Sequence, residues 1–259
     1  MAEGCTSGAT VEARGFVGSD RDGHVCSCAE AGQCRKAAPS PEGTPDTAAV
    51  SLDLAGFAAA PLVREPFDHL VLTGFAPPAL CAGARAAFPL SEHGGLAPAP
   101  QDAPVDDLGR LLAALRRPEV TQAFARKFEL PLDPQALMIH LRSRCQAKDG
   151  RVHTDSRGKL VTALLYLNET WPHQAGRLRL LRSRGDLGAS VAEVLPLDGT
   201  LVAFRRTDHS WHGHHPFVGV RRCIMFNWMV DAATARRELR RHALSSGIKR
   251  LIPSALVGR

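Results

Sequence analysis

Two short segments of the sequence place imidazole and carboxylate groups at spacings that suit a bound metal ion. In His153-Thr154-Asp155 the first and third side chains share one side of an extended chain, because the strand period is two. The segment 207–217, TDHSWHGHHPF, carries four histidines between two apolar runs. Two imidazoles and one carboxylate form a known three-ligand metal site. His153 and Asp155 are therefore candidate ligands, with His212 or His214 as the third.

Two adjacent arginines open the apolar run 221–230, RRCIMFNWMV. An arginine that faces the interior of an apolar domain is costly unless it meets an anion. Positions 222, 224, 226 and 228 share one face of the predicted strand and carry Arg, Ile, Phe and Trp, which indicates a pocket lining. This parity favours Arg222 as the inward arginine and leaves Arg221 as the alternative. Tyr166, the only tyrosine, lies in another apolar run, where a buried hydroxyl needs a partner.

The elements that would position these groups change in character along the chain. Apolar spacing, an N-terminal Pro or Asp, and flanking Gly and Pro predict helices over 78–88, 106–117 and 118–128. Short apolar or alternating runs predict strands over 136–144, 159–168, 176–181, 192–197, 200–204 and 221–230. Several short strands after several helices predict a mainly β fold, a mostly antiparallel sandwich or barrel supported by α-helices.

Composition sets the domain boundaries. Residues 1–50 are rich in Gly, Ala, Ser, Pro and Glu without apolar periodicity, which predicts a disordered tail. Residues 51–259 are expected to form one domain, with folded structure beginning near Phe67. Its parts would be a helical support over 67–130, a β core over 135–230 and a basic C-terminal helix over 231–246.

Composition also excludes several classes of protein. The chain has 259 residues and a net charge of +6, a mild excess, and its 5% aromatic content is low for an aromatic nucleic-acid platform. No apolar stretch approaches the roughly 20 residues that a bilayer requires, and no secretory signal is visible. Seven cysteines without such a signal argue against a disulfide framework. We therefore expect a cytoplasmic protein with no nucleic-acid or membrane partner.

The order of these motifs resembles that of the 2-oxoglutarate- and Fe(II)-dependent dioxygenases of the prolyl 4-hydroxylase type. The resemblance covers roughly residues 135–230 and rests on HTD at 153–155, Ser-Trp-His ending at His212, Pro216, and Arg222 ten residues after His212. The connecting segments LLYLNETW, GRLRLL and DGTLVAF also resemble the segments of those enzymes. The resemblance implies a double-stranded β-helix, or jelly-roll, core.

The resemblance also implies roles for the candidate residues. His153, Asp155 and His212 would bind Fe(2+), and 2-oxoglutarate would chelate the iron while Arg222 and Tyr166 hold its distal carboxylate. The reaction would use O₂ to hydroxylate an unidentified substrate, a protein side chain or a small molecule, with release of succinate and CO₂; ascorbate is a further candidate cofactor. The alternatives are a non-catalytic jelly-roll binding module and a zinc-dependent cupin-like enzyme. The complete ligand set argues against the first, and the arginine against the second.

Overall fold

The computed structural model describes residues 50–91, 94–102 and 105–251, with side chains of the last helix as far as Arg241. The predicted tail over residues 1–50 therefore lies almost entirely outside the described residues. The helices are α1 (Leu54–Ala59), α2 (Pro78–Ala86), α3 (Asp107–Leu115), α4 (Pro118–Phe128) and α5 (Ala232–Leu251), with 3-10 turns at Pro134–Ala136 and Leu187–Ala189. The strands are β1 (His69–Leu72), β2 (Ala97–Pro98), β3 (Leu137–Cys145), β4 (Lys159–Tyr166), β5 (Leu178–Leu181), β6 (Ser190–Val194), β7 (Leu201–Arg205), β8 (His212–Gly213) and β9 (Gly219–Met229).

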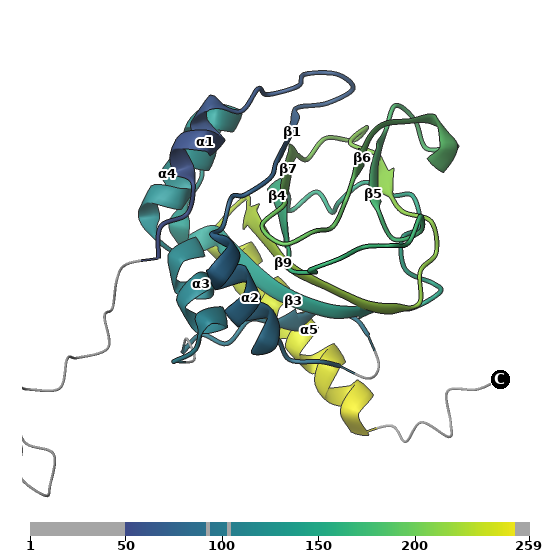
Figure 1. Ribbon diagram of the computed structural model, residues 1–259. Coiled ribbons are helices and arrows are strands. Elements are labelled where there is room, and N and C mark those ends of the chain that lie inside the picture. Colours follow the sequence, from purple (N-terminus) through teal and green to yellow (C-terminus); the bar gives the residue numbers. More distant parts are fainter. Residues whose placement is uncertain (1–49, 92–93, 103–104, 252–259) are drawn as a thin grey trace, which may run out of the picture. The chain divides into compact units, whose positions relative to one another are not determined.

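The strands form two sheets (Figure 1). The larger sheet has the order β1-β7-β4-β9-β3-β2 and the smaller has the order β6-β5-β8, and all pairings are antiparallel. An isolated bridge pairs His153 with His212, which ties the segment after β3 to the smaller sheet. The predicted mainly β, jelly-roll fold with supporting helices is confirmed.

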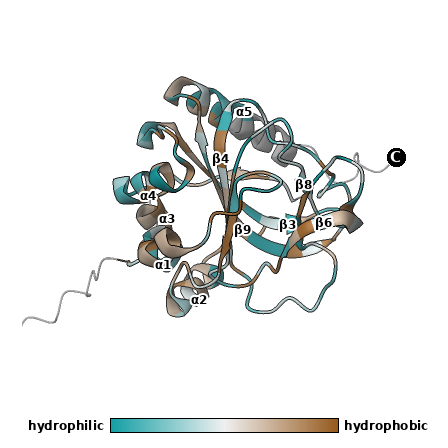
Figure 2. Cartoon of the chain, turned by 90° about the horizontal axis from the view of Figure 1, so that it is seen from above, coloured by the Kyte–Doolittle hydropathy of each residue, from teal (hydrophilic) through white to brown (hydrophobic). Residues whose placement is uncertain are grey.

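Helices α1 to α4 cover one face of the larger sheet (Figure 2), whereas α5 packs against Met138 and Met229 on the other face. Their starts are encoded locally: α2 and α4 begin with a proline, and the Asp106 carboxylate accepts a hydrogen bond from the Gly109 N–H at the start of α3. The apolar stripe of α3 and the aromatic rings of α4 pack on β4 and β9 in one continuous core. This layer supports the sheet from the side opposite to the second sheet.

Strands β4 and β9 are buried on both faces. On the helix side, Leu165 and Ile224 are directly opposite each other, and both belong to the helix-side core. On the other side, Tyr166 is paired with Cys223, and both belong to a second apolar cluster between the sheets. An apolar side chain on either strand therefore does not by itself indicate which face it occupies.

The described structure differs from the sequence prediction at both ends. Ordered structure begins before Phe67, because Asp53 caps α1 and Phe57 is fully buried, with its ring stacked 4.3 Å from that of Phe124. Helix α5 runs to Leu251 rather than ending at 246. Its arginines at 236, 237, 240 and 241 are exposed to solvent.

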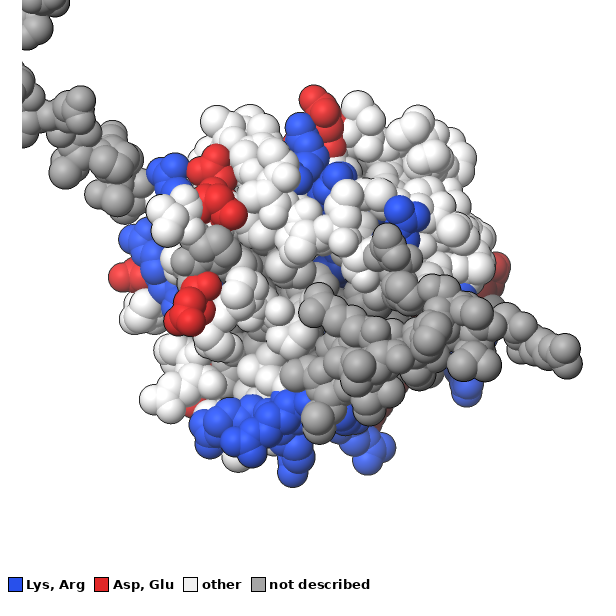
Figure 3. Space-filling model, turned by 90° about the horizontal axis from the view of Figure 1, so that it is seen from below, with Lys and Arg blue, Asp and Glu red and all other residues white. Residues whose placement is uncertain are grey.

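The surface seen in Figure 3 carries both signs of charge, with Lys and Arg side chains gathered at one edge. Of the helices in the described part of the chain, none is long and apolar enough to span a bilayer.

Candidate metal centre

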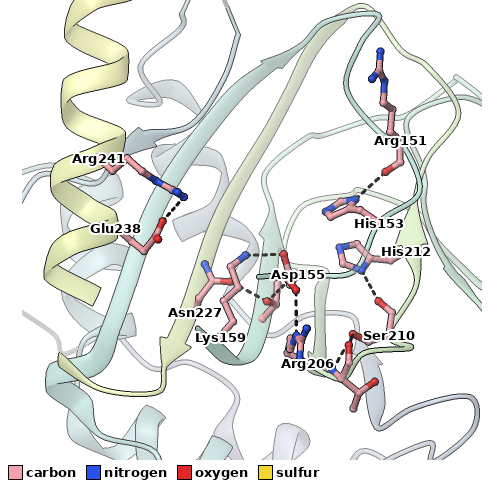
Figure 4. A network of polar contacts seen from close by, with 12 residues as sticks. Arg151, His153, Asp155, Lys159, Arg206, Ser210, His212, Asn227, Glu238 and Arg241 are labelled. Carbon is pink, nitrogen blue, oxygen red and sulfur yellow. Dashed lines mark hydrogen bonds and ion pairs between the residues drawn. The ribbon is translucent and has the colours of Figure 1, made fainter. Parts of the chain in front are cut away.

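Three predicted ligands meet at the open end of the β core. His153 and Asp155 follow β3 on the connection to β4, and His212 forms β8, so the antiparallel bridge between His153 and His212 brings the two motifs together. One ligand atom from each of the three residues lies within 4.8 Å of the others. His212 and Asp155 are 6% and 9% exposed, whereas His153 is open to solvent. Figure 4 shows the His153 ring above the His212 ring, with the Asp155 carboxylate beside the His212 ring.

Backbone carbonyls fix the tautomer of both imidazoles. The Nδ1 of His153 lies 2.8 Å from the carbonyl of Arg151, and the Nδ1 of His212 lies 3.0 Å from that of Ser210 (Figure 4). A carbonyl oxygen can only accept, so each Nδ1 carries a proton, and in the neutral form of each ring Nε2 keeps its lone pair. This is the arrangement that metal-binding histidines adopt, with the second nitrogen hydrogen-bonded to the protein. The donor set therefore fits a divalent metal ion.

The carboxylate of Asp155 is held from two directions. Lys159 at the start of β4 donates to Oδ1 at 2.8 Å, and the Thr162 hydroxyl donates to Oδ2 at 2.5 Å. The same hydroxyl lies 2.9 Å from the amide group of Asn227 on β9. A hydroxyl has one proton, and here it donates that proton to Asp155. The same hydroxyl can accept from Asn227 if the amide is turned so that its nitrogen, which has no other partner among the described residues, faces Thr162. The network fixes the orientation of the carboxylate.

The surroundings favour the metal-binding protonation states of both buried ligands. Burial alone would raise the pKa of Asp155, but Lys159, His212 and the two hydrogen bonds outweigh it and hold that pKa well below the usual range. Burial lowers the pKa of His212 to about 4, although the charge of Asp155 opposes the effect. At neutral pH the site therefore offers one carboxylate and a neutral buried imidazole.

A cavity of about 340 Å³ opens beside the three ligands, between the two sheets. Arg221 and Cys223 of β9 line it, as do Leu164 and Leu178. The guanidinium of Arg221 is 3% exposed; its Nε donates to the Gly176 carbonyl at 2.7 Å and one terminal nitrogen donates to the Tyr166 hydroxyl at 3.0 Å. Within the described residues Arg221 has no ion-pair partner. A buried cation without a carboxylate is suited to bind an anion.

The expectation that Arg222 faces the interior is wrong. Arg222 does not line the cavity and lies on the face of β9 that carries Ile224 and Phe226, near Arg85 and Asp198. The alternation of residues along β9 did not identify the pocket face, because the apolar residues that share a face with Arg222 contact the helices rather than the pocket. The inward arginine is Arg221, nine residues after His212.

His214 lies in the cavity wall but outside the three-ligand cluster. Its backbone N–H donates to the Gly150 carbonyl at 2.9 Å, so the turn after β3 is hydrogen-bonded to the segment after β8. Gly150 has φ +87°, and a side chain there would meet the His214 ring at 2.4 Å. Only glycine permits this close approach. Of the two candidates for the third ligand, the structure brings His212 to His153 and Asp155.

Sequence reasoning missed several groups around the ligands. Lys159, Thr162 and Asn227 contact or support Asp155, and the Gly176 carbonyl orients Arg221. Lys159 carried a detectable signal, because a lysine at the start of an apolar strand, four residues after a candidate ligand, is a natural ion-pair partner. The contacts of Asn227 and Gly176 depend on strand register and loop closure and leave no local signature.

Part of the chain matches one family of known proteins. Residues 142–230 match the family model described as the 2OG-Fe(II) oxygenase superfamily. No curated protein is significantly similar to the chain in sequence.

Several solved structures are similar to it. A Pseudomonas putida prolyl-4-hydroxylase is 22% identical over 62% of this chain and 91% of its own, with a TM-score of 0.46. An oxidoreductase of the 2OG-Fe(II) oxygenase family from Burkholderia pseudomallei is 12% identical over 68% of this chain and 90% of its own, with a TM-score of 0.46. A third structure is a Trichoplax adhaerens prolyl hydroxylase in complex with a hypoxia inducible factor oxygen degradation domain peptide fragment. It is 13% identical over 65% of this chain and 86% of its own, with a TM-score of 0.39.

The matched segment runs from within β3 to the end of β9 and contains the three-ligand cluster, Tyr166 and the buried Arg221. Residues 142–230 are therefore similar to the 2OG-Fe(II) oxygenase superfamily, and the three-ligand cluster within this segment offers donors that suit Fe(2+).

Proposed function

We propose that this protein hydroxylates a compact substrate at the cavity beside His153, Asp155 and His212, with Arg221 as the anchor of 2-oxoglutarate. One observation carries the assignment of residues: the three-ligand cluster and a buried arginine, which has no ion-pair partner among the described residues, open into the same cavity. A metal-chelating dicarboxylate needs both features, since one end binds the metal and the other end needs a cation. Neither a neutral ligand nor a simple metal hydrolase would require the arginine.

The named side chains would bind either the metal or the cosubstrate. His153, Asp155 and His212 would hold the iron through two neutral nitrogens and one carboxylate oxygen. The guanidinium of Arg221 would pair with the distal carboxylate of 2-oxoglutarate, and Tyr166, whose hydroxyl is already hydrogen-bonded to Arg221, would donate a further hydrogen bond to it. When bound, iron supplies the redox chemistry of the superfamily, in which 2-oxoglutarate, O₂ and R–H give succinate, CO₂ and R–OH.

Two further features serve the same reaction. Burial raises the pKa of Tyr166 above its ordinary value, so the phenol stays protonated and can donate to a carboxylate. Leu164, Leu178 and Met225 form an apolar part of the cavity wall. Such a wall limits water around the reacting groups and strengthens the charge pairing at Arg221.

Succinate formation from 2-oxoglutarate tests this function. The purified chain is assayed with Fe(II), with Zn(II) and with a chelator, each with and without O₂. We expect succinate and CO₂ in equal amounts only when both Fe(II) and O₂ are present. Equal activity with Zn(II), or binding of 2-oxoglutarate without any turnover, would refute the proposal in favour of a zinc enzyme or a binding module.

A further inference from the structure

The cavity carries more positive charge than the proposed reaction requires. Five cationic side chains line it against two carboxylates, which gives a net charge of +3 when the histidines are neutral; the cations are Arg142, Lys148, Arg151, Lys159 and Arg221, and the carboxylates are Asp149 and Asp155. On the proposed function, Fe(II) adds two positive charges and 2-oxoglutarate two negative charges. The loaded cavity therefore keeps the same excess positive charge, which is available to an anion that binds beside the cosubstrate.

Two of the five cations are already assigned to other partners. Lys159 forms an ion pair with Asp155 at 2.8 Å, and Arg221 is assigned to the cosubstrate. The remaining three form a cationic wall, which we define as Arg142, Lys148 and Arg151. Their positive charge is only partly compensated by Asp149, the single carboxylate beside them in the cavity lining.

Arg142 is the member of the cationic wall that lies deepest. It is directly opposite Cys223 in the β3–β9 register, and its side chain is 19% exposed. Its contact with the Asp149 carboxylate is long, at 3.4 Å, and that carboxylate also accepts from the Gln146 N–H at 2.8 Å. The Nε of Arg142 is buried without a hydrogen-bond partner among the described residues. A buried guanidinium with an unfilled donor is a site for a further acceptor.

Lys148 and Arg151 lie at the rim, on the turn that follows β3. The part of the chain described here gives neither residue an ion-pair partner within 4 Å. Two hydrogen bonds fix the backbone of this turn. The Asp149 carboxylate accepts from the Gln146 N–H, and the Gly150 carbonyl accepts from the backbone N–H of His214. Figure 4 shows Arg151 next to His153, with its guanidinium extending away from the ligand cluster. The fixed turn therefore places two exposed cationic side chains near the cavity, where they can attract an anion.

We propose that the primary substrate is a compact acid whose carboxylate or phosphate group binds Arg142, with Lys148 and Arg151 drawing it into the cavity. The cavity volume of about 340 Å³ is at the small end of the range for ligand pockets, roughly 300–1,000 Å³, and 2-oxoglutarate occupies part of it. The remaining space suits a small molecule.

Anion binding to the loaded protein tests the cationic wall directly. The full chain, ¹⁵N-labelled and loaded with Zn(II) and saturating 2-oxoglutarate, is titrated with sulfate at constant ionic strength, and the amide signals of residues 148–151 are followed. We expect saturable shifts at these amides, and Arg142→Gln should weaken sulfate binding at least fivefold. The matched control is Arg205→Gln, because Arg205 is also a strand arginine with a long ion pair, 4.0 Å to Asp68, but lies outside the cavity lining.

Three results would overturn the proposal: no saturable shift, equal sulfate affinity in Arg142→Gln, or sulfate affinity that falls as 2-oxoglutarate increases. The last result would assign the anion to the cosubstrate site. Loss of Zn(II) or 2-oxoglutarate binding is visible before sulfate is added and would count against the proposed function instead.

Turnover gives a second, independent measurement. Succinate formation is measured with compact compounds supplied in pairs, each a carboxylic acid and its carboxamide. Acids should stimulate turnover more than their amides, and Arg142→Gln should lower kcat/KM for a stimulating acid at least tenfold while Arg205→Gln leaves it unchanged. An amide that stimulates as well as its acid would overturn the assignment of substrate class.

Discussion

Replacing Arg221 with alanine removes the one buried cation that has no carboxylate partner among the described residues. In the protein its guanidinium is held by the Gly176 carbonyl and the Tyr166 hydroxyl, which leaves further N–H groups for the distal carboxylate of 2-oxoglutarate. Loss of one partner of a buried, hydrogen-bonded charge pair costs about 2–5 kcal/mol. Since about 1.4 kcal/mol corresponds to a factor of ten, 2-oxoglutarate should bind roughly 30-fold more weakly or worse.

Companion variants separate the contributions of charge and geometry. Arg221→Lys keeps the charge but loses the planar fork, so its affinity for 2-oxoglutarate should be intermediate. Tyr166→Phe removes one hydrogen bond and should cost about 1 kcal/mol, or roughly fivefold. Arg222→Ala is the matched control, because its side chain lies on the opposite face of the same strand and outside the cavity.

The assay is a titration of Fe(II)-loaded, oxygen-free protein with 2-oxoglutarate, followed by the metal-to-ligand charge-transfer absorption. Fe(II) affinity is measured separately for each variant and should be unchanged, because none of these side chains belongs to the ligand cluster. If Arg222→Ala weakens 2-oxoglutarate binding while Arg221→Ala does not, the assignment from the structure is wrong. If neither substitution matters, the cosubstrate is anchored elsewhere.

Four further predictions concern the metal site and its support. Asp155→Ala should abolish Fe(II) binding measured by equilibrium dialysis, and retained full affinity would exclude it as a ligand. Lys159→Met, which frees one oxygen of Asp155, should weaken Fe(II) binding about 10–100-fold and shift the ligand-field spectrum of Co(II)-loaded protein, with partial rescue in Lys159→Arg. Gly150→Ala should lower the melting temperature, since its side chain would meet the His214 ring at 2.4 Å; an unchanged melting temperature would show that the turn can move without cost. Metal-free protein should lose stability as pH falls from about 6.5 to 4, because the pKa of both His212 and His214 is lowered to about 4 in the fold while the unfolded chain takes up these protons near pH 6.5. Each imidazole accounts for up to about 3 kcal/mol by this linkage, and a melting temperature that is the same at pH 7 and pH 5 would refute it.

The sequence by itself determined the parts that depend on local chemistry. Helix starts followed from proline and the Asp106 cap, and strand positions followed from short apolar runs between turns. The spacing of His153 and Asp155 already placed both groups on one side of an extended segment. These features are local because capping, side-chain periodicity and backbone preference act over only a few residues.

Tertiary structure decided which residues share a cavity. Both faces of β9 are buried, so alternation could not distinguish the helix-covered face of Arg222 from the pocket face of Arg221. The distinction depends on the register of β9 against β4, which pairs Tyr166 with Cys223 and brings the tyrosine hydroxyl to Arg221. Register is a long-range property, because it is set by contacts between segments about 55 residues apart.

The choice between His212 and His214 had the same cause. Both belong to one short histidine-rich segment, and only the bridge between His153 and His212 determines which ring joins the cluster. The support of Asp155 by Asn227 and the approach of Gly150 to His214 likewise join segments that are distant in the chain. The sequence therefore determined the ligand types and their elements, whereas strand pairing and loop closure determined which side chains meet, because those contacts form only when the whole sheet has assembled.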